Sequence, residues 1–268
     1  MKRGLAVRLI SVAVAAGIAC IGVGVNAGGR DWQGRKLPDT PVNFIIGYGS
    51  LINAVSRGST AGATIPAIPV RVAAAFGYIR SWNSRADAFT ALGLRSPHPG
   101  ESAITINGVL YPVKDAELQE YDGREKNYRR VEVPLSQIEA VSWQRLPETG
   151  HLWIYVPRDP GTQGTAVDGS AAADADHPLL QSYIDVVIEG GLEYGDDFAK
   201  EIIETSDGWS GFWLNDRELA RRPLQVLDPR AAKVDELLKK TLTPAQFSAR
   251  VFPEMYSDIV RAAAAKQP

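Results

Sequence analysis

The sequence predicts an α+β fold: a small mixed β-barrel, closed or strongly curved, followed by a helical C-terminal extension. Apolar segments rich in β-branched residues follow one another closely through the first two-thirds of the chain, which favours a curved or closed sheet. Apolar residues at helical spacing dominate the last third. With 268 residues, of which 45% are hydrophobic, the chain can bury a sizeable core. We expect a single domain over residues 42–268, with the barrel at 42–156 and the helical extension at 177–268.

The amino terminus has the pattern of a secretory signal. Basic residues precede an apolar run over residues 9–25, and small residues follow at Val25 and Ala27, which is the arrangement of a signal-peptide cleavage site. We therefore expect a signal peptide over residues 1–27, export to the periplasm, and a flexible lead-in over residues 28–41.

Two alternatives to cleavage after Ala27 remain open. The apolar run has 17 residues, which is just long enough to cross a bilayer as an uncleaved anchor. Gly17-Ile18-Ala19-Cys20 distantly resembles a lipoprotein cleavage box, although it lacks the expected leucine and further apolar residues follow it. Cys20 is the only cysteine, so cleavage after Ala27 would leave a chain without disulfides, catalytic thiolate or cysteine-bound metal.

Strand-like segments predominate between residues 42 and 156. A short helix that begins at Asp115 and ends near Gly123 interrupts them, and we interpret the small, polar residues 53–63 as a loop. Asn107-Gly108 is a possible turn. The predicted strands cover residues 42–46, 69–82, 89–94, 103–113, 129–135 and 152–156.

Helical patterns follow a long loop, rich in Gly, Ala and Asp, at residues 157–177. The first helical stripe places Tyr183 among aliphatic residues, with Pro178 in the first turn. An aromatic loop at residues 208–213 lies in the same half of the chain. The predicted helices cover residues 180–188, 196–203, 230–241 and 244–265.

A strand that ends in a glycine-rich turn, Ile46-Gly47-Tyr48-Gly49-Ser50-Leu51, is the first candidate for a binding site. Glycines on both sides of a tyrosine let the backbone bend sharply and come close to a bound group. The free amide groups of such a turn can bind an anion such as a carboxylate. By itself, however, the segment is more typical of a strand that ends in an ordinary turn.

The second candidate is a run of charged and phenolic residues, Asp122-Gly123-Arg124-Glu125-Lys126-Asn127-Tyr128-Arg129-Arg130. Charge runs usually lie on solvated helix ends. This run lies between a predicted helix and a predicted strand, where a side chain can point into the mouth of a barrel. We expect Arg124 to form an ion pair with Asp122 or with another acid.

Together, the two segments resemble the gamma-glutamylcyclotransferase superfamily, and most closely its glutathione-degrading, ChaC-like branch. Residues 46–52, Ile-Gly-Tyr-Gly-Ser-Leu-Ile, match a strand end of the form Phe-Gly-Tyr-Gly-Ser-Leu-Ile. Residues 122–130 match a later Asp-x-Arg-Glu-x-x-x-Tyr-Arg segment, and the order and separation of the two motifs agree. The similarity covers residues 42–156, with a weaker match at residues 181–185, Gln-Ser-Tyr-Ile-Asp.

The resemblance implies a barrel of this superfamily's type and an enzyme that cleaves a γ-glutamyl amide, either glutathione or another γ-glutamyl peptide or amine. In this family the substrate's own α-amino group attacks its γ-carbonyl and releases 5-oxoproline and a free amine. Because ring closure is intramolecular, the enzyme mainly orients the substrate, which can be worth about 7–11 kcal/mol. A base must deprotonate the ammonium group and can then protonate the leaving nitrogen, without a metal or a cofactor.

Carried over residue by residue, the resemblance assigns the acid–base role to Glu125, whose pKa should be raised to roughly 6–7 by partial burial. Tyr128 and Tyr155 are candidates to bind the substrate or to orient Glu125, although such tyrosines more often belong to the core. The amide groups of the turn would hold the glutamyl carboxylate and carbonyl; they belong to Tyr48, Gly49, Ser50 and Leu51.

Other functions have little support in the sequence. A net charge of −2, from 29 basic and 31 acidic residues, predicts no polybasic surface for nucleic acid. The turn around Ser50 lacks the second glycine of a serine-hydrolase elbow, and neither a phosphate loop nor a full dinucleotide fingerprint is present. The three histidines, His98, His151 and His177, share no metal-ligand spacing, so we expect no metal site.

The alternative function is that of an exported, non-catalytic binding protein for a small γ-glutamyl or amino-acid-like ligand. Such a protein would share the fold without turning the ligand over. Export favours this alternative, because the best-known substrate of the family is cytosolic.

Overall fold

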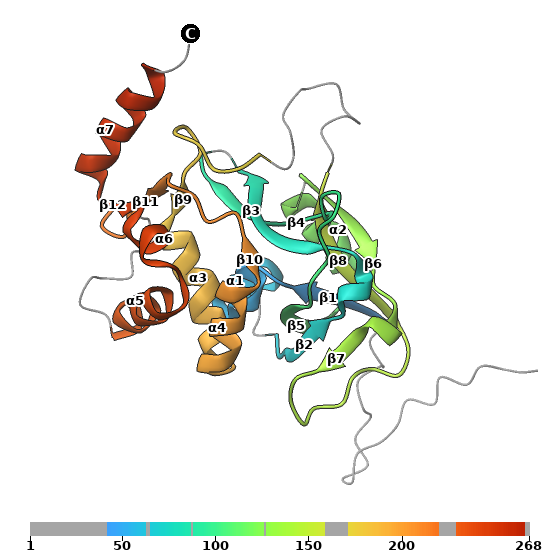
Figure 1. Cartoon of the computed structure of the whole chain (residues 1–268). Coiled ribbons are helices and arrows are strands. Elements are labelled where there is room, and N and C mark those ends of the chain that lie inside the picture. The colour runs from blue at the N-terminus through green and yellow to red at the C-terminus, as the bar shows by residue number, and fades with distance from the viewer. Residues whose placement is uncertain are drawn as a thin grey trace, which may run out of the picture. The chain divides into compact units, whose positions relative to one another are not determined.

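A computed structural model of the chain describes residues 42–62, 65–86, 88–125, 127–158, 171–219 and 229–265 (Figure 1). The predicted signal peptide and lead-in, and most of the predicted loop at 157–177, lie outside these residues. One compact unit spans residues 41–268. None of the helices in the described ranges combines the length and the apolarity that crossing a bilayer requires.

The largest sheet has six strands, and β1 (Asn43–Gly47) lies at its centre. It is antiparallel to β5 (Ile106–Val113) on one side and parallel to β8 (His151–Pro157) on the other. All five residues of β1 are buried, because the strand is paired along both edges. The order across the sheet is β6-β8-β1-β5-β2-β7, with β2 at Ile68–Val72, β6 at Tyr128–Glu132 and β7 at Ile138–Ala140.

Successive residues of β1 point into two different clusters of buried side chains, as alternation along a strand requires. Phe44 and Ile46 belong to one cluster, together with residues of β2 and β5. Ile45 belongs to the other, which the helical half of the chain completes (Figure 1). The helices that contribute to it are α3 (Gln181–Leu192), α4 (Asp196–Glu204) and α5 (Pro229–Thr241).

The α+β class is confirmed, but the predicted closed barrel is not. Closure would require the outermost strands of the largest sheet to pair, and among the described residues β6 pairs only with β8, and β7 only with β2. β7 has three residues and follows β6 after a single 3-10 turn at Leu135–Gln137. The remaining strands form two three-stranded sheets: β10-β3-β4 (Ser206–Asp207, Ile79–Arg85, Thr90–Arg95) and β12-β11-β9 (Arg250–Val251, Trp213–Leu214, Leu179–Leu180).

Residues 53–63, predicted as a loop, instead contain helix α1 (Ala54–Ala61). The side-chain oxygen of Asn53 accepts a hydrogen bond from the Ser56 amide at 3.0 Å, which caps the first turn. Gly62 ends the helix in the left-handed conformation, with φ at 66°. The asparagine cap and the glycine stop were readable signals, but the small, polar residues between them are weak helix formers.

The prediction of a possible turn at Asn107-Gly108 is also wrong, because β5 runs unbroken through both residues. Asn107 is fully buried, and its side-chain amide donates to the carbonyl oxygen of Phe198 at 2.8 Å. A Cβ on Gly108 would lie 2.6 Å from the carbonyl oxygen of Gly47, so glycine here lets the two strands approach closely. The polar pair therefore serves packing inside the sheet.

Other element boundaries also differ from the predictions. The predicted strand at 69–82 is two strands, because Gly77 has φ at 86° and ends the 3-10 turn between β2 and β3. Pro178 precedes β9 and so lies outside the first turn of α3. Pro253, which cannot continue a helix because it lacks an amide hydrogen, divides the predicted helix at 244–265 into α6 (Pro244–Ser248) and α7 (Pro253–Ala264). Helix α2 covers Asp115–Arg124, as predicted.

Candidate active site

The chain folds back directly after β1, and Gly47 makes this bend possible. A Cβ on Gly47 would lie 2.8 Å from the Cβ of Leu51, so a side chain here would push the turn away from the strand. A single 3-10 turn follows over Ser50–Ile52, closed by a 2.9 Å hydrogen bond from the Ile52 amide to the Gly49 carbonyl oxygen. The first amides of a helix have no partner within it, so those of Ser50 and Leu51 need partners outside the turn.

Two buried arginines hold the carbonyl groups of this turn. Arg80 donates to the carbonyl oxygen of Tyr48 at 3.3 Å, and Arg57 donates to those of Leu51 and Ile52 at 3.0 and 2.8 Å. Burial lowers the pKa of Arg80 to about 9, which still leaves it charged at neutral pH. Neither arginine lines the cavity in front of the turn. The turn therefore lies against fixed positive charge, which favours an anion on its amide side.

Tyr48 contributes to the site through its position in the turn, because its hydroxyl is already engaged. The hydroxyl donates to the carbonyl oxygen of Tyr155 at 2.7 Å and so ties the turn to β8. Burial raises the pKa of this phenol well above its usual value, and the nearby Tyr128 and Glu125 act in the same direction. Tyr48 is thus a neutral hydrogen-bond donor that fixes the turn.

Glu125 lies at the C-terminal end of α2, where the backbone on both sides of it is bonded. Its amide donates to the carbonyl oxygen of Tyr121 at 2.8 Å, and its carbonyl oxygen accepts from the Tyr128 amide at 2.8 Å. These bonds join the end of α2 to the start of β6 and fix the backbone of Glu125 beside the cavity. The predicted junction between helix and strand is therefore confirmed.

The Glu125 side chain is only 16% exposed, and burial raises the pKa of its carboxyl group. Arg124, whose Nε lies 3.3 Å from Oε1 of Glu125, lowers the pKa and partly offsets the effect of burial. A helix C-terminus is also an unfavourable place for a negative charge. Arg124 thus pairs with Glu125, whereas Asp122 pairs with Arg130 at 3.1 Å.

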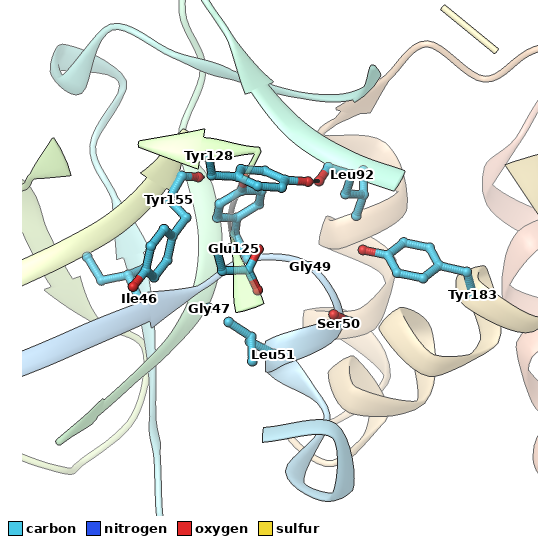
Figure 2. A pocket seen from close by; sticks show the side chains of 11 residues that line it. Ile46, Gly47, Gly49, Ser50, Leu51, Leu92, Glu125, Tyr128, Tyr155 and Tyr183 are labelled. Carbon is cyan, nitrogen blue, oxygen red and sulfur yellow. Dashed lines mark hydrogen bonds between the residues drawn. The ribbon is translucent and has the colours of Figure 1, made fainter. Parts of the chain in front are cut away.

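Tyr128 and Tyr155 flank Glu125, but neither hydroxyl is bonded to it. The Tyr128 hydroxyl donates to the carbonyl oxygen of Leu92 at 3.1 Å (Figure 2). The Tyr155 hydroxyl donates to Asp122 at 2.9 Å. Burial is the main cause that raises the pKa of both phenols, so both are neutral donors at physiological pH.

Tyr183 of α3 completes the site and was not among the predicted site residues. Its hydroxyl points into the cavity from the side opposite Tyr155 (Figure 2). Burial raises its pKa, Glu125 acts in the same direction, and hydrogen bonds with Ser50 act against both. On the sequence it belonged to an apolar helical stripe, and the only signal for a site role was the weak family match around it.

Aromatic packing holds Tyr183 in this position. Its ring lies edge-on to Trp82, with centroids 6.0 Å apart, and tilted against Phe89 at 5.2 Å. Trp209, from the predicted aromatic loop, packs on Trp82 at 5.2 Å. Helix α3 also lies very close to the turn, since a Cβ on Gly190 would be 2.4 Å from the Asn53 amide nitrogen. Through Trp209 and Trp82, the aromatic loop supports Tyr183 on the side that faces away from the cavity.

One cavity of about 40 Å³ brings together all the predicted site residues (Figure 2). Glu125 faces the turn across it, and four further residues, Ile46, Gly47, Leu92 and Tyr183, complete the lining. No histidine lines it, so Ser50 has no adjacent imidazole base. The described residues contain no group of three or more His, Cys, Asp or Glu placed to hold a metal ion. The roles assigned to the lining residues stay predictions.

Neither a protein-family model nor a curated protein matches the chain. Solved structures do match. One is a gamma-glutamyl cyclotransferase with 10% identity and a TM-score of 0.43, covering 74% of this chain and 98% of that one. A yeast gamma-glutamyl cyclotransferase specific to glutathione has 15% identity and a TM-score of 0.30, covering 83% and 99%. A protein of Arabidopsis thaliana has 21% identity and a TM-score of 0.32, covering 43% and 61%.

These TM-scores lie below 0.5 and the identities below 25%, so the case for a function rests on the residues of the site. The solved structures to which this chain is similar nevertheless include gamma-glutamyl cyclotransferases, the superfamily that the motifs at residues 46–52 and 122–130 resemble.

Proposed function

We propose that the protein is a gamma-glutamylcyclotransferase-type enzyme that converts a γ-glutamyl amide into 5-oxoproline and a free amine. The observation that carries the proposal is the environment of Glu125, a carboxyl group of raised pKa that faces the Gly47–Leu51 turn across one small cavity. A perturbed acid opposite a backbone anion site is a typical arrangement for proton transfer on an anchored substrate.

In the proposed reaction the turn amides bind the glutamyl carboxylate, and the substrate's α-amino nitrogen attacks its own γ-carbonyl carbon. The ammonium group loses two protons as it becomes the lactam nitrogen, and the departing nitrogen takes up the same number as it leaves as an ammonium group. One carboxylate that accepts protons from the attacking nitrogen and donates them to the departing nitrogen can carry out both transfers. Glu125 is the acidic residue that lines the cavity.

The raised pKa of Glu125 suits this role. A carboxylate of ordinary pKa is a weak base at neutral pH, and proton transfer is most efficient when the pKa of the base lies near the working pH. Burial supplies the shift, and the charge of Arg124 lowers the pKa and so favours the ionised form. Both effects are needed, because the first step requires the ionised form.

The cavity must widen to admit a glutamyl group. Its volume of about 40 Å³ is far below the roughly 300 Å³ of the smaller ligand pockets in proteins. Tyr183 and Leu92 narrow it on the side of Gly49, where a Cβ would lie 3.4 Å from the Tyr183 hydroxyl and 3.6 Å from the Leu92 Cβ. We expect the Tyr183 side chain to shift when the substrate binds and its hydroxyl to donate to the bound group.

The direct test is release of 5-oxoproline by the full-length chain from glutathione, γ-glutamyl dipeptides and γ-glutamylamines. Glu125→Gln should abolish release while substrate binding, measured by calorimetry, is retained. Glu120→Gln is the matched control, because Glu120 is an exposed carboxyl group on the same helix and does not line the cavity. Equal turnover by Glu125→Gln would remove Glu125 from its proposed role.

The same assay separates the enzyme from the non-catalytic binding protein. If γ-glutamyl compounds bind but none of them yields 5-oxoproline, the cavity is a binding site and the proposal fails. If the chain is exported, as residues 1–27 predict, its natural substrate is a γ-glutamyl compound outside the cytoplasm.

A further inference from the structure

A second cavity, of about 260 Å³, lies among β3, β4, β6 and β8 and shares no lining residue with the candidate active site. Its volume approaches that of the smaller ligand pockets found in proteins. None of the described residues that line it is acidic, and four of them are basic or can become so: Arg95, His98, Arg129 and Arg158. The cavity is therefore suited to an anion.

The two cavities lie on opposite faces of the same pair of strands. In the register of β6 and β8, Arg129 is paired with Val156, and both line the second cavity. Tyr128 and Tyr155, one residue earlier on each strand, line the candidate active site. Because side chains alternate between the faces of a strand, the second cavity is a separate site and not an extension of the first.

Asn83 is the residue that suggests a bound ligand. It is 3% exposed, it lines the second cavity, and neither its side-chain oxygen nor its side-chain nitrogen has a hydrogen-bond partner. Leaving both groups unpaired in the interior is costly, because each has lost its hydrogen bonds to water without a replacement. A ligand that reaches the Asn83 amide, accepts from its nitrogen and donates to its oxygen would remove this cost.

The backbone around Asn83 is adapted to its position. The register of β3 with β4 shifts between Trp82 and Ser84, so Asn83 is the extra residue of a β-bulge. Bulges often redirect a side chain next to a functional site. On the facing strand, a Cβ on Gly93 would lie 2.5 Å from the Asn83 side-chain oxygen, so glycine at this position makes room for the amide.

The arginines of the second cavity differ in how far they are already neutralised. Arg95 forms ion pairs with Glu101 at 2.6 Å and with Asp207 at 2.5 Å. Arg129 is exposed and donates to the Tyr78 hydroxyl at 3.1 Å. Within the part of the chain that the structure describes, neither Arg129 nor Arg158 has a carboxylate partner. These two cations are available to a ligand.

We propose that the second cavity binds a small molecule that carries a carboxylate or phosphate group together with a hydroxyl or amide group. The oxyanion binds to Arg129 and Arg158, and the neutral polar group exchanges hydrogen bonds with Asn83. Arginine suits this task because its planar donors match an oxyanion.

The test is isothermal titration calorimetry of the full-length chain at low ionic strength with glycerol 3-phosphate and with citrate as probes. Saturable binding of one of them is expected, and which one binds distinguishes a phosphate ligand from a carboxylate ligand. Glycerol, which has the hydroxyl groups without the charge, should not bind measurably. Absence of saturable binding by both anions up to about 10 mM, corresponding to less than about 3 kcal/mol of binding free energy, would overturn the proposal.

Variants locate the binding. Asn83→Ala should weaken it about tenfold or more, because the ligand loses hydrogen bonds in a buried position. Arg129→Gln and Arg158→Gln should each weaken it several-fold, whereas Arg145→Gln, an exposed arginine that does not line the cavity, should leave it unchanged. If Asn83→Ala unfolds, the exposed Arg129 and Arg158 decide the test. Binding that Arg129→Gln and Arg158→Gln leave unchanged would also overturn the proposal.

Discussion

The two cavities on β6 and β8 are built from the same strands and have opposite chemistry. On one face, Tyr128 and Tyr155 surround a buried carboxyl group in about 40 Å³. On the other, Arg129 and Val156 border about 260 Å³ with a basic lining. Residues that are neighbours in the sequence thus serve different sites, because strand geometry sends them to opposite faces.

The two cavities differ in how far their charged groups are exposed to water. Glu125 is withdrawn from water, and its pKa is raised as a result. Arg129 and Arg158 remain exposed, so they can attract an anion over a distance, and this attraction weakens with salt. A buried, perturbed acid is typical of proton transfer, whereas exposed cations around a buried amide are typical of binding.

The largest effect is expected when the variant of each site is measured in the assays of both sites. Glu125→Gln should lower 5-oxoproline formation by about 10²- to 10⁴-fold, the usual contribution of a general acid–base group, and leave anion binding at the second cavity unchanged. Arg129→Gln should do the reverse. The measurements are the 5-oxoproline assay and calorimetry on both variants. Loss of both properties in either variant would contradict the independence of the two sites.

The two glycines of the turn should respond differently to the same change. Gly47→Ala should lower the free energy of unfolding by about 1–3 kcal/mol, because its Cβ would lie 2.8 Å from that of Leu51 and the turn must move. Gly49→Ala should leave stability nearly unchanged, since its Cβ meets the Tyr183 hydroxyl at an ordinary 3.4 Å.

Gly49→Ala should nevertheless raise KM, because the added methyl group occupies space on the side where the cavity must widen. Urea unfolding and steady-state kinetics check the pair. Similar losses of stability in both variants would show that the turn is constrained at Gly49 as well.

More of the candidate site than of the fold could be predicted from the sequence. Both motifs are local, so the turn and the end of α2 were recognisable, and the family resemblance indicated that they meet. Tyr183 and the supporting Arg57 and Arg80 were missed because their roles depend on long-range packing. The closed barrel is not confirmed, and the reason is similar: strand spacing says nothing about whether the outermost strands β6 and β7 pair, and among the described residues each pairs only with its inner neighbour.

Arg124→Gln should move the acid side of the pH–activity profile to higher pH. Arg124 lowers the pKa of Glu125 against the effect of burial, so removing its charge lets the pKa rise further. Since the reaction needs ionised Glu125, kcat/KM should fall at a higher pH than in the parent. Ser56→Ala is the control, because it removes the 3.3 Å contact of Arg124 with the Ser56 hydroxyl and keeps the charge. An unchanged acid limb in Arg124→Gln would show that another group controls it.

The same pKa shift affects stability with a defined sign. The pKa of Glu125 is raised in the folded state, so its contribution to stability is fully present below the unfolded value, about 4.3, and is lost as pH rises through the folded value. Glu125→Gln should therefore gain stability relative to the parent between acidic and neutral pH. Thermal unfolding at pH 4 and pH 8 measures this difference, and a constant difference would mean that the carboxyl group is not perturbed.

The two tyrosines beside Glu125 should differ in their effects on stability, because their hydroxyl groups have different hydrogen-bond partners, and Tyr155→Phe should show the smallest effect. Tyr128→Phe leaves the buried carbonyl oxygen of Leu92 without its 3.1 Å bond, so it should cost about 1–3 kcal/mol of stability. Tyr155→Phe releases Asp122, which is 45% exposed and paired with Arg130, so water can replace the hydroxyl and the cost should stay near 0.5 kcal/mol. Chemical denaturation measures both. If Tyr155→Phe costs as much as Tyr128→Phe, the Asp122 network is more rigid than its exposure suggests, and Tyr155 then holds β8 in place both through its carbonyl oxygen, bonded to Tyr48, and through its hydroxyl, bonded to Asp122.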